Sequence, residues 1–520
     1  MKALLAGLVA LAVLAGAATG GIDDAARYLG PDRQQSFDAY VAFITSVHAV
    51  SRDGQKRLGV SWEAALDNGR RRFEEARTVQ DVYYALLSVQ RTLRDGHGRF
   101  RRHGLPVTFG PAVALDFEVA VRYAHQDGGP HEYVVVRSGE STLPVGATVT
   151  GCDSLAIVEY EARLLEWYDR HTPEGFRDFA ARCLSYRRPQ SLPCPHPGDA
   201  APLAWQDVDG TGHETTLTWR AVEGAAANDP DLNGSSVSAV TPPGRRDPPR
   251  FDAQYGDFPL EATGLLFDIH GTRRADTKIL RYVSFNYGNE ADFPPELAAI
   301  ARHLREAGAR RVLVDVRENA GGAFDPALVG LFTPQPFRIM TKSLYYGERL
   351  RTHPEAIGLD PGLELWTEEE ARLLRDDLAA RPAATWSREI PFFCRTAACA
   401  EAETVLRYDG SPGFETVVLC GPATFSSGDM FVTLMKDNGV AKLAGMPSGA
   451  GDAPYRWTLD YPLADGTRVT LRLTNAVSYR PYTGGLTVEG NPPALDFPVF
   501  PTRANAAAYL DSVLAAVGWE

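Results

Sequence analysis

Between residues 276 and 445, short apolar runs alternate with helical patterns. The runs are "ILRYVSF" (279–285), "RRVLVDV" (310–316) and "TVVLC" (416–420), and the helical segments are "PPELAAIARHLREAG" (294–308) and "SGDMFVTLMKDNG" (427–439). Apolar strands linked by helices form right-handed βαβ crossovers in a mostly parallel sheet. Ligands of such sheets bind at the carboxyl ends of the strands. We therefore expect an α/β domain whose functional residues follow Val316 and Cys420.

Two regions and a linker are expected before this domain. Residues 21–104 read as a helical cap, since "TVQDVYYALLSVQRTL" (78–93) has one apolar side and Thr78 as a plausible N-cap. Residues 105–223 alternate like strands, as in "EYVVVRS" and "ETTLTWRAV", around a helical segment at 154–171. Residues 224–258 are rich in Pro, Gly, Ala, Ser and Asp and read as a linker, because they bury too little apolar surface to fold alone. The α/β domain then occupies residues 259–520.

The N-terminal segment "MKALLAGLVALAVLAGAATG" reads as a secretory signal peptide over residues 1–20. It has one lysine, a short Ala/Gly-rich apolar run and a small-residue site at Ala15–Ala17. The alternative is an uncleaved N-terminal anchor. A secreted or periplasmic chain can oxidise its thiols, and the short spacings favour the pairs Cys183–Cys194 and Cys394–Cys399. The formal charge of −13 argues against nucleic acid or an anionic membrane surface as the main partner.

The stretch "VVLCGPATFSSGDMF" (417–431) puts two serines between an apolar strand and a helix. The simplest explanation is helix capping, for which serine is a preferred residue. The functional alternative makes Ser426 a nucleophile, with the backbone N–H of Ser427 at the positive end of the helix receiving an oxyanion. A second donor is available at Gly321–Gly322, where glycine lets backbone N–H groups approach a ligand, although a turn that needs positive φ explains the pair equally well.

A serine nucleophile needs a base and a group that orients the base. His97 stands in an Asp-Gly-His-Gly turn, "LRDGHGRF", that could expose its ring; the alternative is an ordinary surface histidine. His303 and His196 are less suitable, since one lies on a polar helix face and the other beside proline. Glu489, in "GGLTVEGNPPALDFPV", is the candidate acid, and a solvated turn residue is its alternative.

The combined order of these motifs resembles the C-terminal processing peptidases and, more closely, the tricorn-core-like serine peptidases, over residues 276–502. The resemblance implies a ClpP/crotonase-like α/β domain with Ser426 as nucleophile and Ser427 with Gly321 or Gly322 as oxyanion donors. Ser-Lys members of the family place a lysine in the turn that here reads "GMPSGAGDAPY" (445–455), which has none. The tricorn-like variant uses a histidine and a glutamate instead, which implies His97 as the general base and Glu489 as the orienting acid.

Residues 105–223 are similar in position to the PDZ domain of this family, and "LPVGATVTGCDSLAIVEY" (143–160) looks like one of its segments, although Ala147 replaces an aspartate. The implied activity is a serine peptidase that cleaves peptides or tails of unfolded proteins and requires no metal or cofactor. Two alternatives are a non-catalytic relative that binds peptides or apolar ligands and an esterase that uses the same triad. Oligomerisation is left open.

Overall fold

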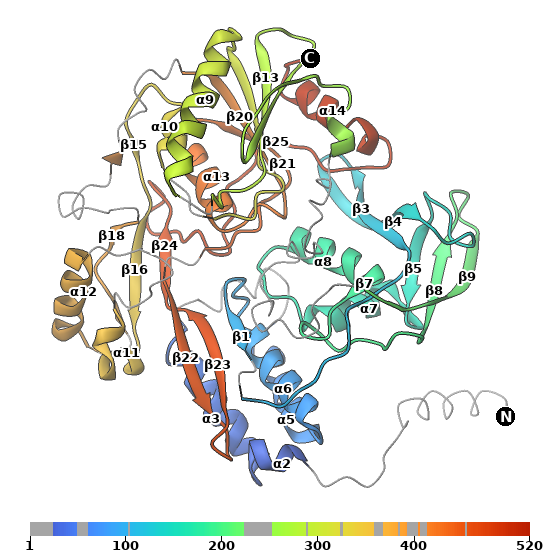
Figure 1. Cartoon of the computed structure of the whole chain (residues 1–520), viewed down its shortest axis with the longest axis vertical. Coiled ribbons are helices and arrows are strands. Elements are labelled where there is room, and N and C mark those ends of the chain that lie inside the picture. Colours follow the sequence, from blue (N-terminus) through green and yellow to red (C-terminus); the bar gives the residue numbers. More distant parts are fainter. Residues whose placement is uncertain are drawn as a thin grey trace.

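The computed structural model describes residues 24–48, 61–101, 104–222, 252–287, 290–322, 326–357, 368–382, 385–392, 404–405, 413–452 and 455–520. The expected signal peptide, most of the expected linker and the pair Cys394–Cys399 lie outside these residues. An α/β domain forms the upper part of the molecule in Figure 1, helices from the N-terminal region form its lower end, and a second sheet lies to one side. No helix in the described ranges has the length and apolarity needed to cross a membrane.

A seven-stranded sheet organises the α/β domain. Its strands are β11 (Leu260–Thr263), β12 (Phe267–Gly271), β13 (Thr277–Tyr282), β14 (Arg311–Asp315), β20 (Glu415–Cys420), β21 (Lys442–Gly445) and β25 (Phe497–Pro498), in that spatial order. From β13 to β25 all neighbours are parallel, which confirms the expected mostly parallel sheet. Strands β11 and β12 add an antiparallel edge that the sequence reading did not include.

Helices cover both faces of this sheet, because its central strands are buried on both sides (Figure 1). Val312 and Val314 of β14 pack with α9 (Phe293–Glu306), α10 (Ala327–Gly330) and α13 (Ser427–Asp437). Leu313, between the two valines, packs on the other face with α14 (Tyr509–Ala516). Side chains of a strand alternate between its faces, so an uninterrupted apolar run supplies both cores.

The N-terminal region is helical, with α2 (Asp24–Leu29), α3 (Arg33–Thr45), α5 (Trp62–Glu75) and α6 (Val79–Arg91). Thr78 caps α6 in a capping box with Asp81, as expected. A hairpin from far along the chain, β22 (Arg456–Pro462) and β23 (Arg468–Thr474), pairs with β1 (Arg99–Arg101). Leu471 and Leu473 of β23 share one hydrophobic core with these helices, so the helical region depends on the C-terminal half of the chain (Figure 1).

The β-rich region holds a six-stranded antiparallel sheet of the order β3-β4-β5-β8-β9, with β6 on β5. Its strands are β3 (Phe117–His125), β4 (Gly128–Ser138), β5 (Thr148–Cys152), β6 (Leu155–Ala156), β8 (Ala200–Gln206) and β9 (Gly212–Thr218). Helices α7 (Ile157–Leu165) and α8 (Pro173–Ser185) pack against it, and a small sheet joins β10 (Arg220–Ala221), β2 (Val113–Ala114) and β7 (Tyr186–Arg187).

The expected disulfide between Cys183 and Cys194 is wrong for this structure, in which both residues are free thiols. Cys183 is buried on α8 and Cys194 packs partly buried against the same core; burial raises the pKa of Cys183 to about 12. Short sequence spacing does not by itself bring two sulfur atoms into bonding geometry.

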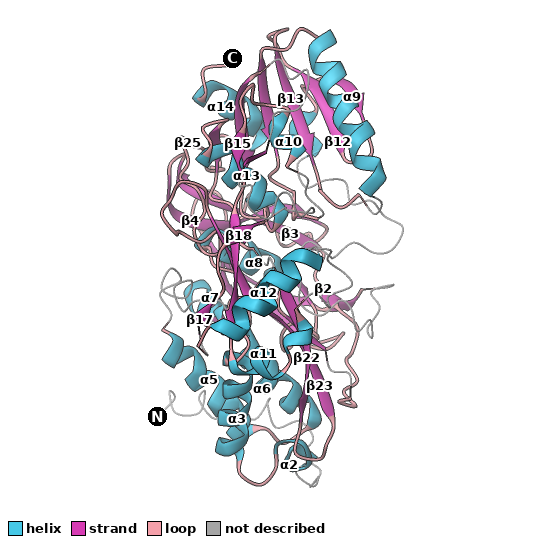
Figure 2. Cartoon of the chain, turned by 90° about the vertical axis from the view of Figure 1, so that its left-hand side faces the viewer, coloured by secondary structure: helices cyan, strands magenta, loops and turns pink. Residues whose placement is uncertain are grey.

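The remaining elements flank the α/β domain, and Figure 2 shows them on the side that faces the viewer. They are β15 (Phe337–Arg338), β16 (Thr341–Tyr346), β17 (Thr385–Trp386), β18 (Ile390–Pro391), β19 (Thr404–Val405), β24 (Ala476–Tyr479), α11 (Glu348–Thr352) and α12 (Glu368–Ala380). Short 3-10 turns cover Asp252–Tyr255, Glu290–Asp292, Pro354–Ala356 and Ala506–Ala508. Strand β16 pairs with β24, which links this flank to the segment that leads to Glu489.

Candidate active site

Ser426 lies at the corner between β20 and α13, in the N-cap position of the helix. Its side chain makes no capping hydrogen bond, and its backbone has φ 57° and ψ −126°. A positive φ is strained for a residue with a Cβ, and such strain persists only where the surrounding structure enforces it, often at active sites. A serine on a strained strand-to-helix turn presents its hydroxyl outward, as in a nucleophile elbow. The capping explanation therefore does not account for this residue.

The loop after β14 holds the serine turn in place. The N–H of Phe425 donates to the carbonyl of Asn319 at 3.0 Å, and the Thr424 hydroxyl donates to the carbonyl of Val316 at 2.8 Å. The Ser427 hydroxyl donates to the carbonyl of Gly322 at 2.6 Å. The carboxyl ends of two neighbouring parallel strands thus meet at the serine, as the sheet topology requires.

His97 reaches this corner from the other end of the chain. Its Nε2 lies 2.8 Å from Oγ of Ser426, across 329 residues of sequence. The turn that carries the ring is held by Asp95, whose Oδ1 accepts the backbone N–H of His97 at 2.9 Å and that of Gly98 at 2.8 Å. Asp95 is fixed in turn by Thr474, whose N–H donates to Oδ2 at 2.9 Å and whose hydroxyl donates to Oδ1 at 3.0 Å.

Sequence reasoning did not single out Asp95, the residue that fixes the His97 turn. It is buried, and Nε2 of His48 lies 3.3 Å from its Oδ2. Burial alone would raise the pKa of Asp95, but the contact with His48, the nearby His97 and the Thr474 N–H hold that pKa well below its usual range. Its place two residues before His97 in a glycine turn was the available signal, since aspartate commonly bonds the backbone two residues on.

The ring of His97 is buried, and its surroundings disfavour the protonated imidazolium form. It stacks on Phe425, with the ring centroids 4.8 Å apart and the planes at 20°. Burial, followed by the positive charges of Arg456, Arg170 and Arg99, lowers its pKa to about 3, although Asp95 opposes the shift. Nδ1 has no hydrogen-bond partner among the residues that the structure describes. The imidazole is thus neutral at ordinary pH and able to accept a proton from a neighbouring hydroxyl.

Glu489 lies in the same buried region but is bonded to a different histidine. Its Oε1 shares a hydrogen bond with Nε2 of His171, and its Oε2 accepts the N–H of Asp452 at 2.6 Å. Burial and then the charge of Asp95 raise the pKa of Glu489 well above its usual range. The structure therefore brings Ser426 to His97 and Glu489 to His171. Sequence reasoning missed His171, which it read only as the last residue of the helical segment 154–171.

Backbone donors surround the serine. Gly321 and Gly322 have φ of 101° and 140°, and a Cβ on Gly321 would lie 2.7 Å from Cβ of Ser426. The N–H of Gly321 donates to Oδ1 of Asn319 at 2.9 Å. The N–H groups of Gly322 and Ser427 make no hydrogen bond within the described part of the chain, and Ser427 begins α13 at the positive end of its dipole.

Asp429, one turn into α13, connects the helix to the loop before β22. It is fully buried, and its Oδ2 accepts the N–H of Gly451 at 2.9 Å. Burial raises its pKa to about 7, although hydrogen bonds from this loop act in the opposite direction. The next residue of the loop, Asp452, is the one that donates to Glu489, so the acid and the serine helix share a support.

A comparison with family models identifies the region that carries this serine. Residues 276–493 match the model of peptidase family S41. These residues are therefore similar to the S41 peptidases, and they are called the S41 domain below. The chain is accordingly a serine-type peptidase, and the expected resemblance to this superfamily is confirmed. The S41 match includes Gly321, Gly322, Ser426 and Glu489, whereas His97 comes from outside it.

Solved structures similar to the chain extend well beyond the S41 domain. The crystal structure of mature CPAF has 17% identity over 92% of this chain and 95% of its own, with a TM-score of 0.66. Mature CPAF complexed with lactacystin has 17% identity over 94% of this chain and 97% of its own, with a TM-score of 0.64. These likenesses show a shared fold along nearly the whole chain. The photosystem II D1 C-terminal processing protease has a TM-score of only 0.36, at 14% identity over 90% of this chain and 94% of its own. No curated protein sequence matches the chain.

In the described ranges, no three or more histidine, cysteine, aspartate or glutamate side chains are grouped so that they could hold a metal ion.

Proposed function

We propose that the S41 domain cleaves peptides or protein tails through an acyl-enzyme on Ser426, with His97 as general base and Glu489 as the supporting acid. The observation that carries the proposal is the 2.8 Å separation between Nε2 of His97 and Oγ of Ser426. That separation is within reach for direct proton transfer, and the serine belongs to the family-matched region.

In the first half-reaction, Oγ of Ser426 attacks the peptide carbonyl while its proton moves to Nε2 of His97. The tetrahedral oxyanion is stabilised by the N–H of Ser427 and by the Gly321–Gly322 pair, in which the Gly322 N–H has no acceptor among the described residues. Each such donor contributes about 3 to 4 kcal/mol to the transition state. The proton then passes from His97 to the leaving amine, and water hydrolyses the ester by the same steps.

Glu489 supports the imidazolium that forms when His97 takes the proton. Burial raises the pKa of Glu489, and the positive charge that forms on His97 favours the ionised form of this carboxyl group. A buried carboxylate in a region of low dielectric acts over longer distances than one in water, so direct contact with Nδ1 is not required for an electrostatic contribution. Catalytic hydrogen bonds are also often long or misaligned before substrate binds. His171 and the Asp452 N–H hold the carboxylate in place for this role.

A fluorophosphonate probe tests the nucleophile on the purified full chain. We expect a covalent label on the Ser426 peptide in the wild type and none in Ser426→Ala. Ser512→Ala, on α14 in the same domain, is the matched control and should keep the label. A label at another serine, or none in the wild type, would contradict the assignment. Mass spectrometry of a digested peptide library then defines the cleaved bonds.

Two further assignments complete the proposal. The six-stranded sheet region, residues 105–223, is a PDZ-like module that binds substrate as an added strand; its order ends at β9 on one side, and an edge strand offers unpaired backbone groups. Residues 1–20 act as a signal peptide and direct the chain to a secreted or periplasmic location. N-terminal sequencing of the exported protein tests the second assignment, with cleavage near Ala17 as the expected result.

A further inference from the structure

Arg170 is a buried cation with no paired carboxylate among the described residues. It lies in the segment between α7 and α8, and only 7% of its surface is exposed. Its guanidinium carbon sits 4.1 Å from the ring centroid of Phe425. Arg170 makes no hydrogen bond or ion pair with any residue that the structure describes. A guanidinium has five N–H donors, and buried charges are normally paired because desolvation without compensation is costly.

The unused donors of Arg170 remain reachable. The nitrogen atoms of its guanidinium keep some exposure to solvent, although the side chain as a whole is buried. The stem is held close to the turn that carries the base, since a Cβ on Gly96 would lie 3.3 Å from Cγ of Arg170. A planar donor group that is fixed by packing and open at its nitrogen atoms is suited to a two-pronged acceptor such as a carboxylate.

This cation is linked to the reacting groups through one aromatic ring. Phe425 directly precedes Ser426, and the same Phe425 ring stacks on the ring of His97. A single aromatic ring therefore contacts both the general base and the guanidinium. A ligand group bound to Arg170 would belong to a residue near the scissile bond.

Other arginines reinforce the positive field at this point. In the three-stranded sheet, Arg99 of β1 is opposite Arg472 of β23, and Arg456 of β22 is opposite Thr474 of β23. Because side chains alternate along strands, these residues lie on the face opposite to the one that Leu471 and Leu473 bury in the core. Thr474 is fastened to Asp95, so this face begins at the His97 turn.

The overall composition makes this concentration of arginine notable, because the whole chain has a formal charge of −13. Arg456, Arg170 and Arg99 are also the three cations whose charge acts on His97. A local positive field in an acidic protein attracts and orients an anionic ligand at that place.

We propose that Arg170, assisted by Arg99 and Arg456, forms a carboxylate subsite beside Ser426, so that the enzyme prefers peptides with an aspartate or glutamate next to the scissile bond. This inference rests on the proposed peptidase function and adds its substrate class. The α-carboxylate at the end of a chain has the same chemistry, and the peptides described below separate the two sources.

Matched internally quenched peptides test the subsite on the full chain. One set carries Glu and the other Gln at each position around the bond found in the library digest, all with amidated C-termini. We expect kcat/KM to favour the Glu peptide by about tenfold or more, as for charge-assisted hydrogen bonds. In Arg170→Gln this ratio should fall towards one. Both peptides are measured on one preparation, so a general loss of activity cancels in the ratio.

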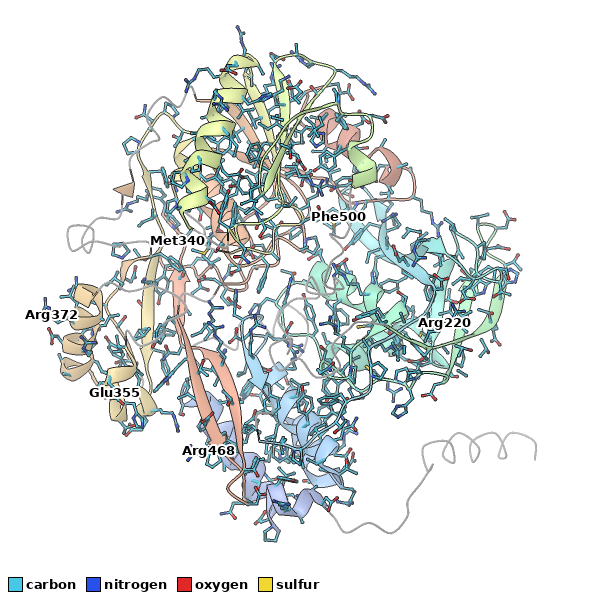
Figure 3. All side chains as sticks on the ribbon, viewed as in Figure 1. Arg220, Met340, Glu355, Arg372, Arg468 and Phe500 are labelled. Carbon is cyan, nitrogen blue, oxygen red and sulfur yellow. The ribbon has the colours of Figure 1, made fainter. Side chains whose placement is uncertain are left out.

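The control variant is Arg468→Gln. The Arg468 side chain is 71% exposed and lies at the tip of the β22–β23 hairpin, which also carries Arg456, at the lower end of the molecule in Figure 3. It should keep the wild-type ratio. Equal cleavage of Glu and Gln peptides by the wild type, or an undiminished ratio in Arg170→Gln, would overturn the proposal. A preference that appears only with free C-termini would overturn it in favour of recognition of the chain end.

Two measurements keep the test decisive if Arg170→Gln does not fold. Arg456→Gln should lower the ratio by itself, and the wild-type ratio should fall as salt rises from low to high concentration, because screening weakens ion pairing. A ratio that changes in neither measurement counts against the subsite. Failure of the peptidase function is distinguishable, since the wild type would then neither accept the fluorophosphonate nor cleave any peptide; a labelled enzyme without a Glu preference refutes only the subsite.

Discussion

Glu489 and His171 are hydrogen-bonded through Oε1 and Nε2, although 318 residues separate them in the sequence. Both side chains are buried, and His171 immediately follows Arg170, which packs on Phe425. Two consecutive residues of one segment therefore contact two parts of the candidate site. Any movement of that segment relative to α13 would change the surroundings of the acid and of the base together.

Removal of the His171 ring should impair catalysis without removing any group that we assign to bond making. In His171→Ala the buried Glu489 loses a hydrogen-bond partner, and we expect kcat to fall by about 10- to 100-fold, the effect of leaving a buried polar group without its partner. His171→Gln can still donate a hydrogen bond and should recover part of the loss. Steady-state kinetics with thermal unfolding as a folding check measures both; His213→Ala, in the distant β9, is the control. Full activity in His171→Ala would remove the residue from the site.

The backbone strain at Ser426 can be tested separately from the proposed role of its hydroxyl as the nucleophile. Ser426→Ala and Ser426→Gly should both lose peptidase activity by a factor on the order of 10⁴ or more. Glycine adopts the observed φ of 57° without a Cβ penalty, so Ser426→Gly should unfold at a higher temperature than Ser426→Ala, with a difference of about 1 kcal/mol. Differential scanning calorimetry compares the two variants. An alanine variant as stable as the glycine variant would show that the turn is not strained.

The pH profile should reveal the low pKa of His97. A general base must be neutral, so a pKa of about 3 moves the acid limb of kcat/KM far below the value near 6.5 of an ordinary histidine. Arg456→Gln removes a positive charge near His97. The loss of this charge stabilises the imidazolium and raises the pKa of His97, so activity at pH 4 should fall more than activity at higher pH. Rates from pH 3 to 8 on a neutral peptide test this, with Arg468→Gln as control. A limb near 6.5 in the wild type would contradict the burial argument.

Gly321 has no room for a side chain. In Gly321→Ala the new Cβ would meet Cβ of Ser426 at 2.7 Å, the carbonyl of Phe425 at 2.9 Å and the N–H of Ser427 at 2.9 Å. We expect loss of activity, because the serine and an oxyanion donor are both displaced. Gly198→Ala is the matched control: its φ of 95° is similar to the 101° of Gly321, but no heavy atom lies within 4 Å of the added Cβ. Equal activity of the two variants in peptide hydrolysis would show that the contacts at Gly321 do not matter.

Much of the sheet could be predicted from sequence because its signals are local. The apolar runs of β13 and β14, with helix α9 between them, fix the βαβ order and hence which strand ends meet. The corner at Ser426 was visible as two serines and a glycine after such a strand. The strained φ of Ser426 could not be predicted, because it depends on the Asn319 loop, a distant segment whose carbonyl accepts the N–H of Phe425.

Arg170, His171 and Asp95 were not singled out because their roles depend on distant partners. The Thr474 groups that fix Asp95 are 379 residues away, on a hairpin that pairs with β1. Arg170 precedes an ordinary capped helix, and no periodic pattern indicates that its guanidinium will lie on Phe425. Periodicity reports which face of an element is buried, but it does not report which distant side chain that face will meet.

Asp429 makes the stability of the fold depend on pH in a direction opposite to that of most paired carboxylates. Burial raises its pKa to about 7 from the ordinary value of 3.8, so the folded protein keeps a proton that the unfolded chain releases. The stabilisation associated with that proton is complete below pH 3.8 and is lost as pH rises to about 7. Asp429→Asn is neutral throughout and should therefore gain stability relative to the wild type between pH 4 and pH 8, by up to several kcal/mol.

Urea unfolding of the wild type and Asp429→Asn at pH 5 and pH 8 measures this difference. Asp257→Asn, at an exposed position, should show no comparable change with pH. The asparagine amide lacks the charge but retains an oxygen that can accept the N–H of Gly451, so the loop that holds Asp452 should stay in place. If the relative stability of Asp429→Asn instead fell from pH 5 to pH 8, the carboxylate would be ionised in the folded state, and the loop hydrogen bonds rather than burial would control its pKa.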